Sequence, residues 1–438
     1  MSIRDEARRL DPAARRAFVS NAAKTCLGVS ALSALPQSEA EASQKGRDTK
    51  RLPGFGKAKN VIYIFNSGAM SQIDTFDPKP GTEEQGSVGV IGTSVPGVQV
   101  TSFFPEIAKR MNKIAVVRSL TTVTGNHQDA AYLMRTNYKP LGSIRHPSLG
   151  VWAQHFLGDP ATELPRTVTI ANSDRHPGAG FMPSKFSPLP VARADRGVEN
   201  TKPPGYLDAK NLNRRLGLID KFNKKFIDTY SDPAVSAYTD FYDGAVGLMS
   251  GKDLAAFDIT KEKQGIRDAY GKSRLAQGCL LARRLVESGV PFVEVGNGGW
   301  DHHQDFVQRM QEKGPELDKA VATLLDDLDS RGMLKDTLVV VTTEFGRKPQ
   351  IDEVRDGRGH HPGAFCSLLI GAGVNAGQVY GATDAKAHYV EEDGVTVQDF
   401  NATIAHLMGL PLHEEAISPS GRPFTVADDG EPVTKLFA

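Results

Sequence analysis

The chain has 438 residues, with 52 basic and 52 acidic side chains and a formal net charge of zero. Without a surplus of positive charge, it lacks the broad electrostatic footprint of proteins that bind nucleic acid or anionic membranes, so a small ligand is the better expectation. The three cysteines, Cys26, Cys279 and Cys366, include no CxxC pair and do not form an even-numbered disulfide framework, so they assign no compartment.

The N-terminal segment, residues 1–50, resembles a twin-arginine export signal followed by a linker. Arg15 and Arg16 come before a weakly apolar run, Leu27 to Leu35, which is followed by a polar stretch. We therefore expect export to the periplasm or cell envelope; the alternative is a disordered or helical N-terminal arm. No segment approaches the roughly 18 apolar residues that span a membrane, so no transmembrane anchor is expected.

Apolar runs in the first half of the chain predict strands at residues 61–65, 114–117 and 167–170. Helices are predicted at 104–111, between the first two strands, and at 148–157. A strand, a helix and a second strand in this order form the unit from which parallel sheets are built.

The segment at about 171–260 is predicted to be an insertion in the domain formed by residues 51–438. Its first part, 171–205, is rich in Pro, Gly, Ser and Arg, and we expect a long loop over the mouth of the site. Residues 212–258 have apolar side chains at helical spacing. The simpler interpretation of this helical part is a packing element without chemistry.

The second half of the chain continues the alternation of strands and helices. Helices are predicted at 274–288, 306–328 and 396–408, and strands at 290–295, 338–342 and 365–370. Gly289 follows the first of these helices, as is typical of a helix C-terminus. The alternation predicts an α/β fold with a doubly wound, mostly parallel sheet and helices on both faces.

Carboxylates and imidazoles follow the predicted strands closely. Asp301 and His303 come after the strand at 290–295, Glu344 and Arg347 after the strand at 338–342, and His360 shortly beyond. Open α/β sheets place their sites at strand ends, and zinc and related metals favour mixed imidazole and carboxylate ligands. Each of these residues alone is more often solvated or structural, but together they predict a metal site.

Five motifs occur in order within residues 59–410. They are Ile73-Asp74-Thr75-Phe76-Asp77-Pro78, Val116-Val117-Arg118-Ser119-Leu120, Gly298-Gly299-Trp300-Asp301, Thr343-Glu344-Phe345-Gly346-Arg347 and Gly381-Ala382-Thr383-Asp384. In combination they resemble the domain of unknown function 1501 family, a large bacterial exported family related to sulfatases and alkaline phosphatases. The resemblance implies an alkaline-phosphatase-like sheet, one or two metal ions at strand ends, and hydrolysis or transfer of phosphate or sulfate esters.

The resemblance also implies a set of metal ligands. Asp301, His303 and His360 correspond to one half of the superfamily's metal site. Glu344 corresponds to part of the other half, although the imidazole expected after it is replaced by Phe345. The superfamily has an aspartate after the first strand where this chain has Asn66, and we expect Asp74, further along the loop, to replace it.

His127 lies where related enzymes have their nucleophile, because Thr124-Gly125-Asn126-His127 resembles the glycine-asparagine-serine run of metal-dependent phosphoglycerate mutases. Two roles follow from this position. Either His127 binds a metal and a metal-bound water attacks, which we favour, or His127 is the transient covalent acceptor. Thr122 and Thr124 are weaker nucleophile candidates. Arg347 is expected to stabilise an anionic oxygen, unless it is a solvated arginine.

The leading hypothesis is an exported metal-dependent hydrolase of phosphate or sulfate esters that uses one or two divalent ions. Zinc, manganese and calcium are not distinguished by the sequence. A second hypothesis is a relative that has lost hydrolysis and binds glycans or anions, and a third is a structural partner of other exported proteins. The expected ligand is a small-molecule or glycan ester, and nothing in the sequence indicates an oligomeric state.

Overall fold

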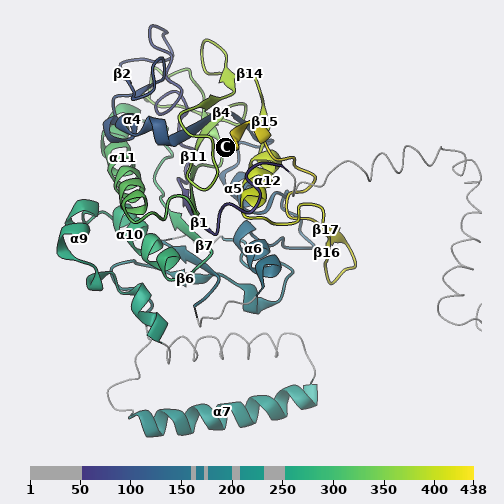
Figure 1. Cartoon of the computed structure of the whole chain (residues 1–438). Helices are drawn as coiled ribbons and strands as arrows, with labels where there is room; N and C mark the ends of the chain where they lie inside the picture. Colours follow the sequence, from purple (N-terminus) through teal and green to yellow (C-terminus); the bar gives the residue numbers. More distant parts are fainter. Residues whose placement is uncertain (1–51, 159–163, 172–175, 200–207, 231–251) are drawn as a thin grey trace, which may run out of the picture. The chain divides into compact units, whose positions relative to one another are not determined.

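A nine-stranded sheet runs through the part of the chain that the computed structural model describes, residues 52–158, 164–171, 176–199, 208–230 and 252–438 (Figure 1). The strand order is β12 (Val379–Tyr380), β4 (Ile114–Thr121), β11 (Phe365–Ile370), β8 (Thr337–Thr342), β1 (Asn60–Phe65), β7 (Phe292–Gly296), β5 (Thr167–Ile170) and β6 (Leu189–Val191), with β15 (Val395–Thr396) also beside β4. Only β11 is antiparallel to its neighbours in this sheet. The predicted mostly parallel sheet is confirmed.

The central strands are apolar on both faces, as is typical of parallel strands covered by helices. In β1, Ile62 and Ile64 belong to one hydrophobic core, whereas Val61, Tyr63 and Phe65 belong to a second core. Because successive side chains of a strand point to opposite faces, the sheet separates the two cores.

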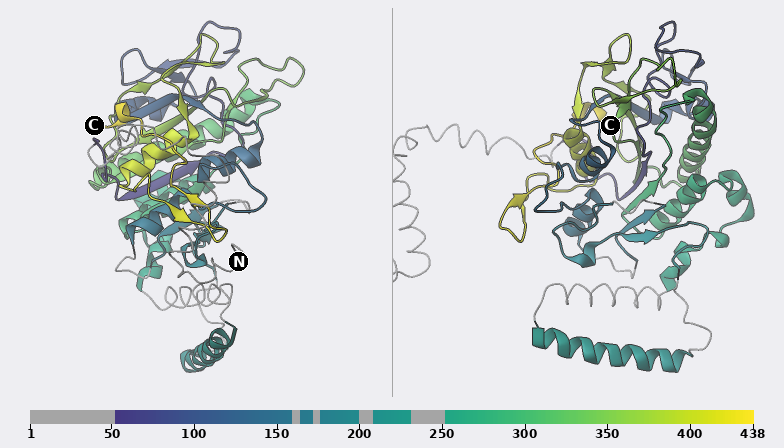
Figure 2. Two further views of the ribbon diagram at one scale, coloured as in Figure 1. Left: turned by 90° about the vertical axis from the view of Figure 1, so that its right-hand side faces the viewer. Right: turned by 180° about the vertical axis from the view of Figure 1, so that it is seen from behind.

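Helices cover both faces of the sheet (Figures 1 and 2). One core is completed by α4 (Pro105–Lys109), α10 (Arg274–Glu287) and α11 (Phe306–Ser330). The other core is completed by α5 (His127–Thr136), α6 (Leu149–Leu157) and α12 (Val397–Leu407). Helices on two faces of a mostly parallel sheet confirm the predicted α/β class.

The helix boundaries follow from local capping signals. Asn126 begins α5 by accepting hydrogen bonds from the backbone N–H groups of residues 128 and 129, and Ser273 caps α10 in the same manner. Thr396 and Asp399 form a capping box at the start of α12. Gly289, just past α10, has a φ of 96°, a value that glycine adopts without strain.

The first two strands predicted from the sequence are parallel members of one sheet but are not neighbours in it. The first two strands of the chain's sheet, β1 and β4, run parallel, but β8 and β11 lie between them. The chain between β1 and β4 therefore passes over two positions in the sheet. These positions are occupied by β8 and β11, which come later in the sequence. Such non-local pairing leaves no signal in the periodicity of the segment itself.

The segment at 171–260 contributes to the sheet, which the sequence did not predict. Its first part contains β6, which pairs in parallel with β5 at the edge of the sheet, and the 3-10 turn Ser184–Phe186. Its second part contains α7 (Ala209–Tyr230) and the 3-10 turns Lys252–Phe257 and Ile259–Lys261. Residues 231–251, also predicted to be helical, lie outside the described residues.

The remaining elements are short. Two-stranded sheets are formed by β2 (Val90–Gly92) with β3 (Gln99–Thr101), β9 (Gly346–Arg347) with β10 (His360–His361), β13 (Ala382–Thr383) with β14 (Val390–Glu392), and β16 (Ala416–Ile417) with β17 (Pro423–Phe424). Helix α9 spans Gln264–Tyr270. None of the helices described is both long and apolar enough to cross a membrane. The predicted export signal lies outside the described residues and stays a prediction.

The topology brings five loops to one edge of the sheet. The carboxyl ends of β1, β4, β7 and β8 meet there because these strands are parallel. Strand β11 runs the other way, so the loop that precedes it, containing β10, reaches the same edge. This is the edge at which open α/β sheets bind their ligands.

Candidate metal centre

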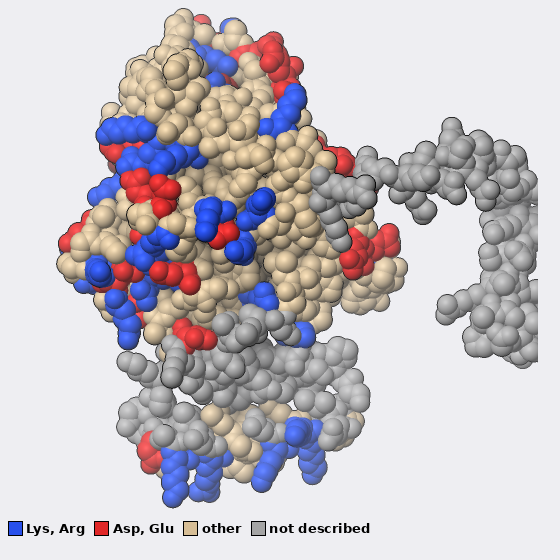
Figure 3. Space-filling model, viewed as in Figure 1, with Lys and Arg blue, Asp and Glu red and all other residues tan. Residues whose placement is uncertain are grey.

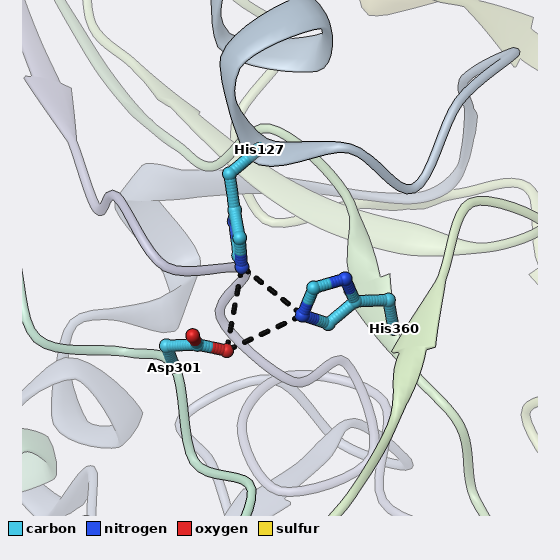
Figure 4. Close-up of side chains that lie close together, drawn as sticks. All are labelled: His127, Asp301 and His360. Atoms are coloured by element: carbon cyan, nitrogen blue, oxygen red, sulfur yellow. Dashed lines mark hydrogen bonds and ion pairs between the residues drawn. The ribbon is translucent and has the colours of Figure 1, made fainter.

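Two histidines and one aspartate from three of these loops point their side chains at a common space (Figure 4). Nε2 of His127 lies 3.1 Å from Nε2 of His360 and 3.3 Å from Oδ1 of Asp301. Nε2 of His360 lies 3.4 Å from the same aspartate oxygen. His127 begins α5, Asp301 follows β7, and His360 begins β10. The loops after β4 and β7 and before β11 therefore build the cluster together.

The three separations match those between the ligands of a tetrahedral metal ion. An ion held at about 2.0–2.1 Å from each ligand keeps neighbouring ligands about 3.3–3.4 Å apart. The observed sides of the triangle are 3.1, 3.3 and 3.4 Å. An ion bound on this face by three protein ligands would keep its fourth position for water or a substrate.

In both imidazoles Nδ1 makes a hydrogen bond away from the common space, while Nε2 faces it. A neutral ring that donates from Nδ1 has its lone pair on Nε2. Nδ1 of His360 donates a hydrogen bond of 2.8 Å to the carbonyl oxygen of Gly125, and Nδ1 of His127 donates one of 2.7 Å to Oε1 of Glu344. In the neutral ring, a proton on Nδ1 leaves Nε2 as an acceptor. The two Nε2 atoms are 3.1 Å apart, a contact that becomes favourable when a metal ion lies between two neutral rings or when one ring carries a second proton.

Glu344, predicted to be a metal ligand, is not one of the three residues whose side chains converge on the common space. Its Oε1 accepts from His127 and from the backbone N–H of Gly68, and its Oε2 accepts from the hydroxyl of Thr343. The residue is 1% exposed. Its carboxylate instead orients the ring of His127, in the way that carboxylates support metal-binding histidines.

His303 approaches the cluster from the side of Asp301 and His360. Its Nε2 lies 3.0 Å from Oδ1 of Asp301 and 2.8 Å from Nε2 of His360. The structure therefore brings His303 together with the other predicted ligands. Burial and the nearby Arg347 keep the pKa of His303 below its usual value despite the charge of Asp301, which favours the neutral ring that binds metals. Its neighbour His302 lies apart, with Nε2 3.0 Å from the carbonyl oxygen of Gly299.

Arg347, predicted to bind an anionic oxygen, is instead occupied in this structure by Asp301 and by two segments of backbone. It is 1% exposed, and its guanidinium donates to the carbonyl oxygens of Gly68, Ala69 and Arg358 as well as to Oδ1 of Asp301. Because these acceptors use its donors, little is left for a substrate. Burial acts to raise the pKa of Asp301, but the hydrogen bond and charge of Arg347 outweigh it and bring the pKa to about 2.

Two glycines allow the loops of the site to approach closely. Gly68 has a φ of 113°, and a side chain there would come within 2.5 Å of the backbone nitrogen of Asp301. A side chain at Gly357 would come within 2.0 Å of the backbone of His303. These two glycines thus allow the loops that carry Asp301 and His303 to pack closely against their neighbours.

Asp74, which we expected to replace the superfamily's first aspartate, lies outside the cluster. It is 1% exposed, and both its oxygens accept hydrogen bonds from the guanidinium of Arg358, at 2.7 and 2.9 Å. Arg358 holds this carboxylate, and Asp74 is not among the residues that converge at the cluster. Asn66, at the end of β1, accepts a 2.7 Å hydrogen bond from the side chain of Asn297.

The two threonines that were weaker nucleophile candidates have no contact with the cluster among the interactions described. The hydroxyl of Thr124 accepts from the backbone N–H of Asn126, so it supports the turn before α5. The hydroxyl of Thr122 is buried without a hydrogen-bond partner. Neither position indicates a nucleophile.

A cavity of about 630 Å³ opens beside the cluster. Its lining includes His127, Asp301 and Glu344 together with polar or charged residues that the sequence analysis did not single out: Ser67, Gln128, Arg135, Arg274 and Asn297. Gln128 follows His127 directly, and Asn297 follows β7, so proximity to the predicted site was the available signal. The volume is typical of pockets that hold small molecules.

The charges around the cavity favour a cation at the cluster and an anion next to it. At the cluster, the two negative charges of Asp301 and Glu344 outnumber the single positive charge of Arg347. The net charge there is therefore negative when the imidazoles are neutral. Glu344 raises the pKa of His127, the effect expected of a carboxylate that attracts positive charge. Further out, the exposed Arg274 adds a positive charge to the cavity wall.

Solved structures with similar folds include a sulfatase, PsFucS1 from Pseudoalteromonas sp., at 14% identity and a TM-score of 0.42, covering 92% of this chain and 76% of the sulfatase. The lipoteichoic acid synthase LtaP from Listeria monocytogenes is 11% identical with a TM-score of 0.40, covering 89% and 81% of the two chains. Alkaline phosphatase from the Antarctic bacterium TAB5 is 14% identical with a TM-score of 0.34, covering 74% and 95%. At these values the similarity does not indicate which reaction this chain performs.

A search of curated protein sequences found no significant match. The family model described as "Protein of unknown function (DUF1501)" matches residues 58–437, which is nearly the whole described unit, Leu52–Ala438. The match spans the loops that carry His127, Asp301, Glu344 and His360, so the resemblance inferred from the motifs is confirmed: the chain belongs to the DUF1501 family.

Proposed function

We propose that this protein is an exported metal-dependent hydrolase of phosphate or sulfate esters. The observation that supports the proposal most directly is the convergence of two imidazole lone pairs and one carboxylate oxygen within 3.1–3.4 Å of one another. The hydrogen bonds from Nδ1 of His127 to Glu344 and from Nδ1 of His360 to the carbonyl oxygen of Gly125 hold the two rings in this orientation. A preformed set of three ligands with an open fourth position is typical of catalytic metal sites.

His127, Asp301 and His360 would hold the ion and leave its fourth position open, and His303 would stand beside this set, with its Nε2 3.0 Å from Oδ1 of Asp301. Nitrogen ligands favour zinc or manganese over calcium, which takes oxygen ligands almost exclusively. When bound, such an ion lowers the pKa of water and polarises an ester oxygen. The described residues support one ion at this cluster, and the second ion of the superfamily would lack the carboxylate expected from Asp74.

The chain's own residues would position the reactants. Glu344 fixes the ring of His127, and Arg347 fixes the carboxylate of Asp301. The cavity admits a substrate beside them, and Arg274 provides a positive charge in its wall that would attract an anionic ester. Ser67 also lines the cavity, so its hydroxyl is the alternative nucleophile that an experiment must exclude.

Export is proposed from Arg15 and Arg16, which precede the apolar run at 27–35. Replacing both arginines by lysine should retain a reporter fusion in the cytoplasm. Unchanged export of the Arg15→Lys, Arg16→Lys fusion would contradict the twin-arginine route.

The proposed reaction is tested in two steps with protein purified without chelators. Metal analysis should find an ion in the wild type and much less in His127→Ala, Asp301→Ala and His360→Ala, whereas the exposed His413→Ala serves as the control. Turnover of aryl phosphates and aryl sulfates should depend on added metal and should persist in Ser67→Ala. Loss of turnover in Ser67→Ala with full metal content would assign the attack to Ser67.

A metal-loaded protein without turnover would favour the second candidate, a binding protein for phosphate or sulfate groups. The orientation of Asn66 favours it to some degree, because this side chain is held by Asn297 where the superfamily has a ligating aspartate. Titration of the metal-loaded protein with inorganic phosphate and sulfate separates the two. Full metal occupancy with neither turnover nor anion binding would contradict both.

A further inference from the structure

Helix α7 presents a cluster of basic side chains to solvent. Its exposed basic residues are Lys210, Arg214, Arg215, Lys221, Lys224 and Lys225. No acidic residue is exposed among the side chains that the structure describes on this helix. The net charge of the whole chain is zero, and for this reason we expected no anionic membrane partner. Locally, however, α7 forms a positively charged surface.

The six basic residues share one side of the helix. At 3.6 residues per turn they fall within an arc of about 180°. Figure 3 shows the Lys and Arg side chains projecting in a row from α7. The row runs from Lys210 to Lys225, so it extends over about 22 Å of the helix.

Two large apolar side chains lie within the same arc and are also exposed. Phe222 is 71% exposed and Leu218 is 44% exposed. The two are four residues apart, so they are neighbours on the helix surface, and Arg214, Arg215 and Lys221 lie within one turn of Leu218. A soluble helix gains nothing from an exposed apolar pair beside a basic row, and a partner that removes the pair from water would explain it.

We propose that α7 binds the surface of an anionic lipid bilayer. Helices that lie in the membrane interface combine Lys and Arg with Phe or Leu, so that the charges meet anionic headgroups while the apolar side chains enter the acyl boundary. The exposed residues of α7 have this composition. Six exposed charges prevent the helix from crossing the bilayer, so it lies on the surface.

A bilayer fits the observations better than a soluble polyanion. A sulfated or phosphorylated polymer would be attracted by the six basic residues alone, and the exposure of Phe222 and Leu218 would have no function. On a bilayer both features contribute, because burial of apolar surface and attraction to charged headgroups add together. The proposal is independent of the reaction at the metal centre.

Co-sedimentation of the full chain with vesicles tests the proposal. We compare vesicles of phosphatidylcholine alone with vesicles that contain phosphatidylglycerol in addition. Wild-type protein should bind only the second kind, and salt should weaken the binding. The Lys221→Gln, Lys224→Gln, Lys225→Gln variant should bind roughly 100-fold more weakly, since each lysine near an anionic surface contributes about fivefold.

Matched variants separate charge from apolar insertion. Replacing the exposed lysines Lys139, Lys319 and Lys335 by glutamine removes the same charge elsewhere and should leave binding unchanged. Leu218→Ser, Phe222→Ser should weaken binding at least tenfold, whereas Val354→Ser, at a position that is 94% exposed, should not. Binding that survives the three-lysine change at α7 would overturn the proposal, because the N-terminal segment or another surface would then be responsible.

The same proteins are also titrated with heparin in the absence of lipid. Heparin binding that depends on Lys221, Lys224 and Lys225 but not on Phe222, with no binding to vesicles, would overturn the bilayer in favour of a soluble polyanion. Binding to neither probe would overturn the proposal altogether.

Discussion

Oε1 of Glu344 lies 2.7 Å from Nδ1 of His127, on the edge of the imidazole opposite to the nitrogen that faces Asp301 and His360. The same oxygen accepts the backbone N–H of Gly68, so the carboxylate is itself fixed. This contact explains why the ring presents a lone pair to the cluster. Through this contact Glu344 would affect the affinity for a metal ion at His127 without being a ligand itself.

Glu344→Gln should raise the dissociation constant for zinc about 10- to 100-fold, because the amide holds the Nδ1 proton less strongly and can reverse the tautomer. The measurement is a competition titration of the purified protein against a chelator of known affinity. The exposed Glu83→Gln is the control for loss of a carboxylate. Equal zinc affinity in wild type and Glu344→Gln would show that this contact does not orient the ligand.

Arg347→Lys should lower the free energy of unfolding by about 2–4 kcal/mol, because a lysine cannot replace the planar fork that reaches several buried acceptors. It should also lower metal occupancy, since Asp301 loses the partner that holds its carboxylate. Urea denaturation and metal analysis report the two effects separately. Arg274→Lys, at an exposed position of the cavity wall, should change the stability by less than about 0.5 kcal/mol.

The sheet and most helices were predictable from the sequence because their signals are local. Strands β1 and β8 contain continuous apolar runs, and α10 has helical spacing with a glycine after it. Strand order is not a local property: β4 is separated from β1 because β11 and β8, from much later in the chain, lie between them. The edge strand β6 is only three residues long and contains a proline, so its sequence resembles a loop.

The candidate site was predictable as a set of loops but not in the roles of all its residues. His127, Asp301, His303 and His360 come together because their loops meet at one edge of the sheet, where β4 and β7 end and β11 begins. Glu344 and Arg347 lie in one of the family motifs and Asp74 lies in another. Each of the three is held by a hydrogen-bond partner that the sequence does not reveal. Residue type and spacing place a side chain near a site, whereas its hydrogen-bond partners decide what it does there.

Asp74→Asn should destabilise the protein by about 3–5 kcal/mol without reducing metal content, because it leaves the buried charge of Arg358 without its partner. Urea denaturation and metal analysis of the same preparation give both quantities. In a double-mutant cycle with Arg358→Gln, the two costs should not add, since both changes break one interaction. If the Asp74→Asn protein is folded but contains no metal, Asp74 is a metal ligand after all.

His146 should make stability depend on pH between about pH 6.5 and pH 4. It is fully buried, stacks on Tyr138 and accepts a hydrogen bond from Tyr132, and burial lowers its pKa to about 4. In the unfolded chain its pKa is about 6.5, so within this interval the unfolded state binds a proton that the folded state does not. The stabilisation by the neutral ring is complete above pH 6.5 and is lost as the pH falls toward 4, by up to about 3 kcal/mol.

His146→Gln removes the titrating group and should therefore flatten part of this dependence. Free energies of unfolding are measured by urea denaturation at several pH values between 4 and 7, with a chelator present so that the metal centre does not contribute. Wild type should lose up to about 3 kcal/mol more than His146→Gln across this range, because other groups titrate equally in both proteins. The exposed His413→Gln should follow the wild-type curve. Parallel curves for wild type and His146→Gln would show that His146 is protonated in the folded protein as readily as in the unfolded chain.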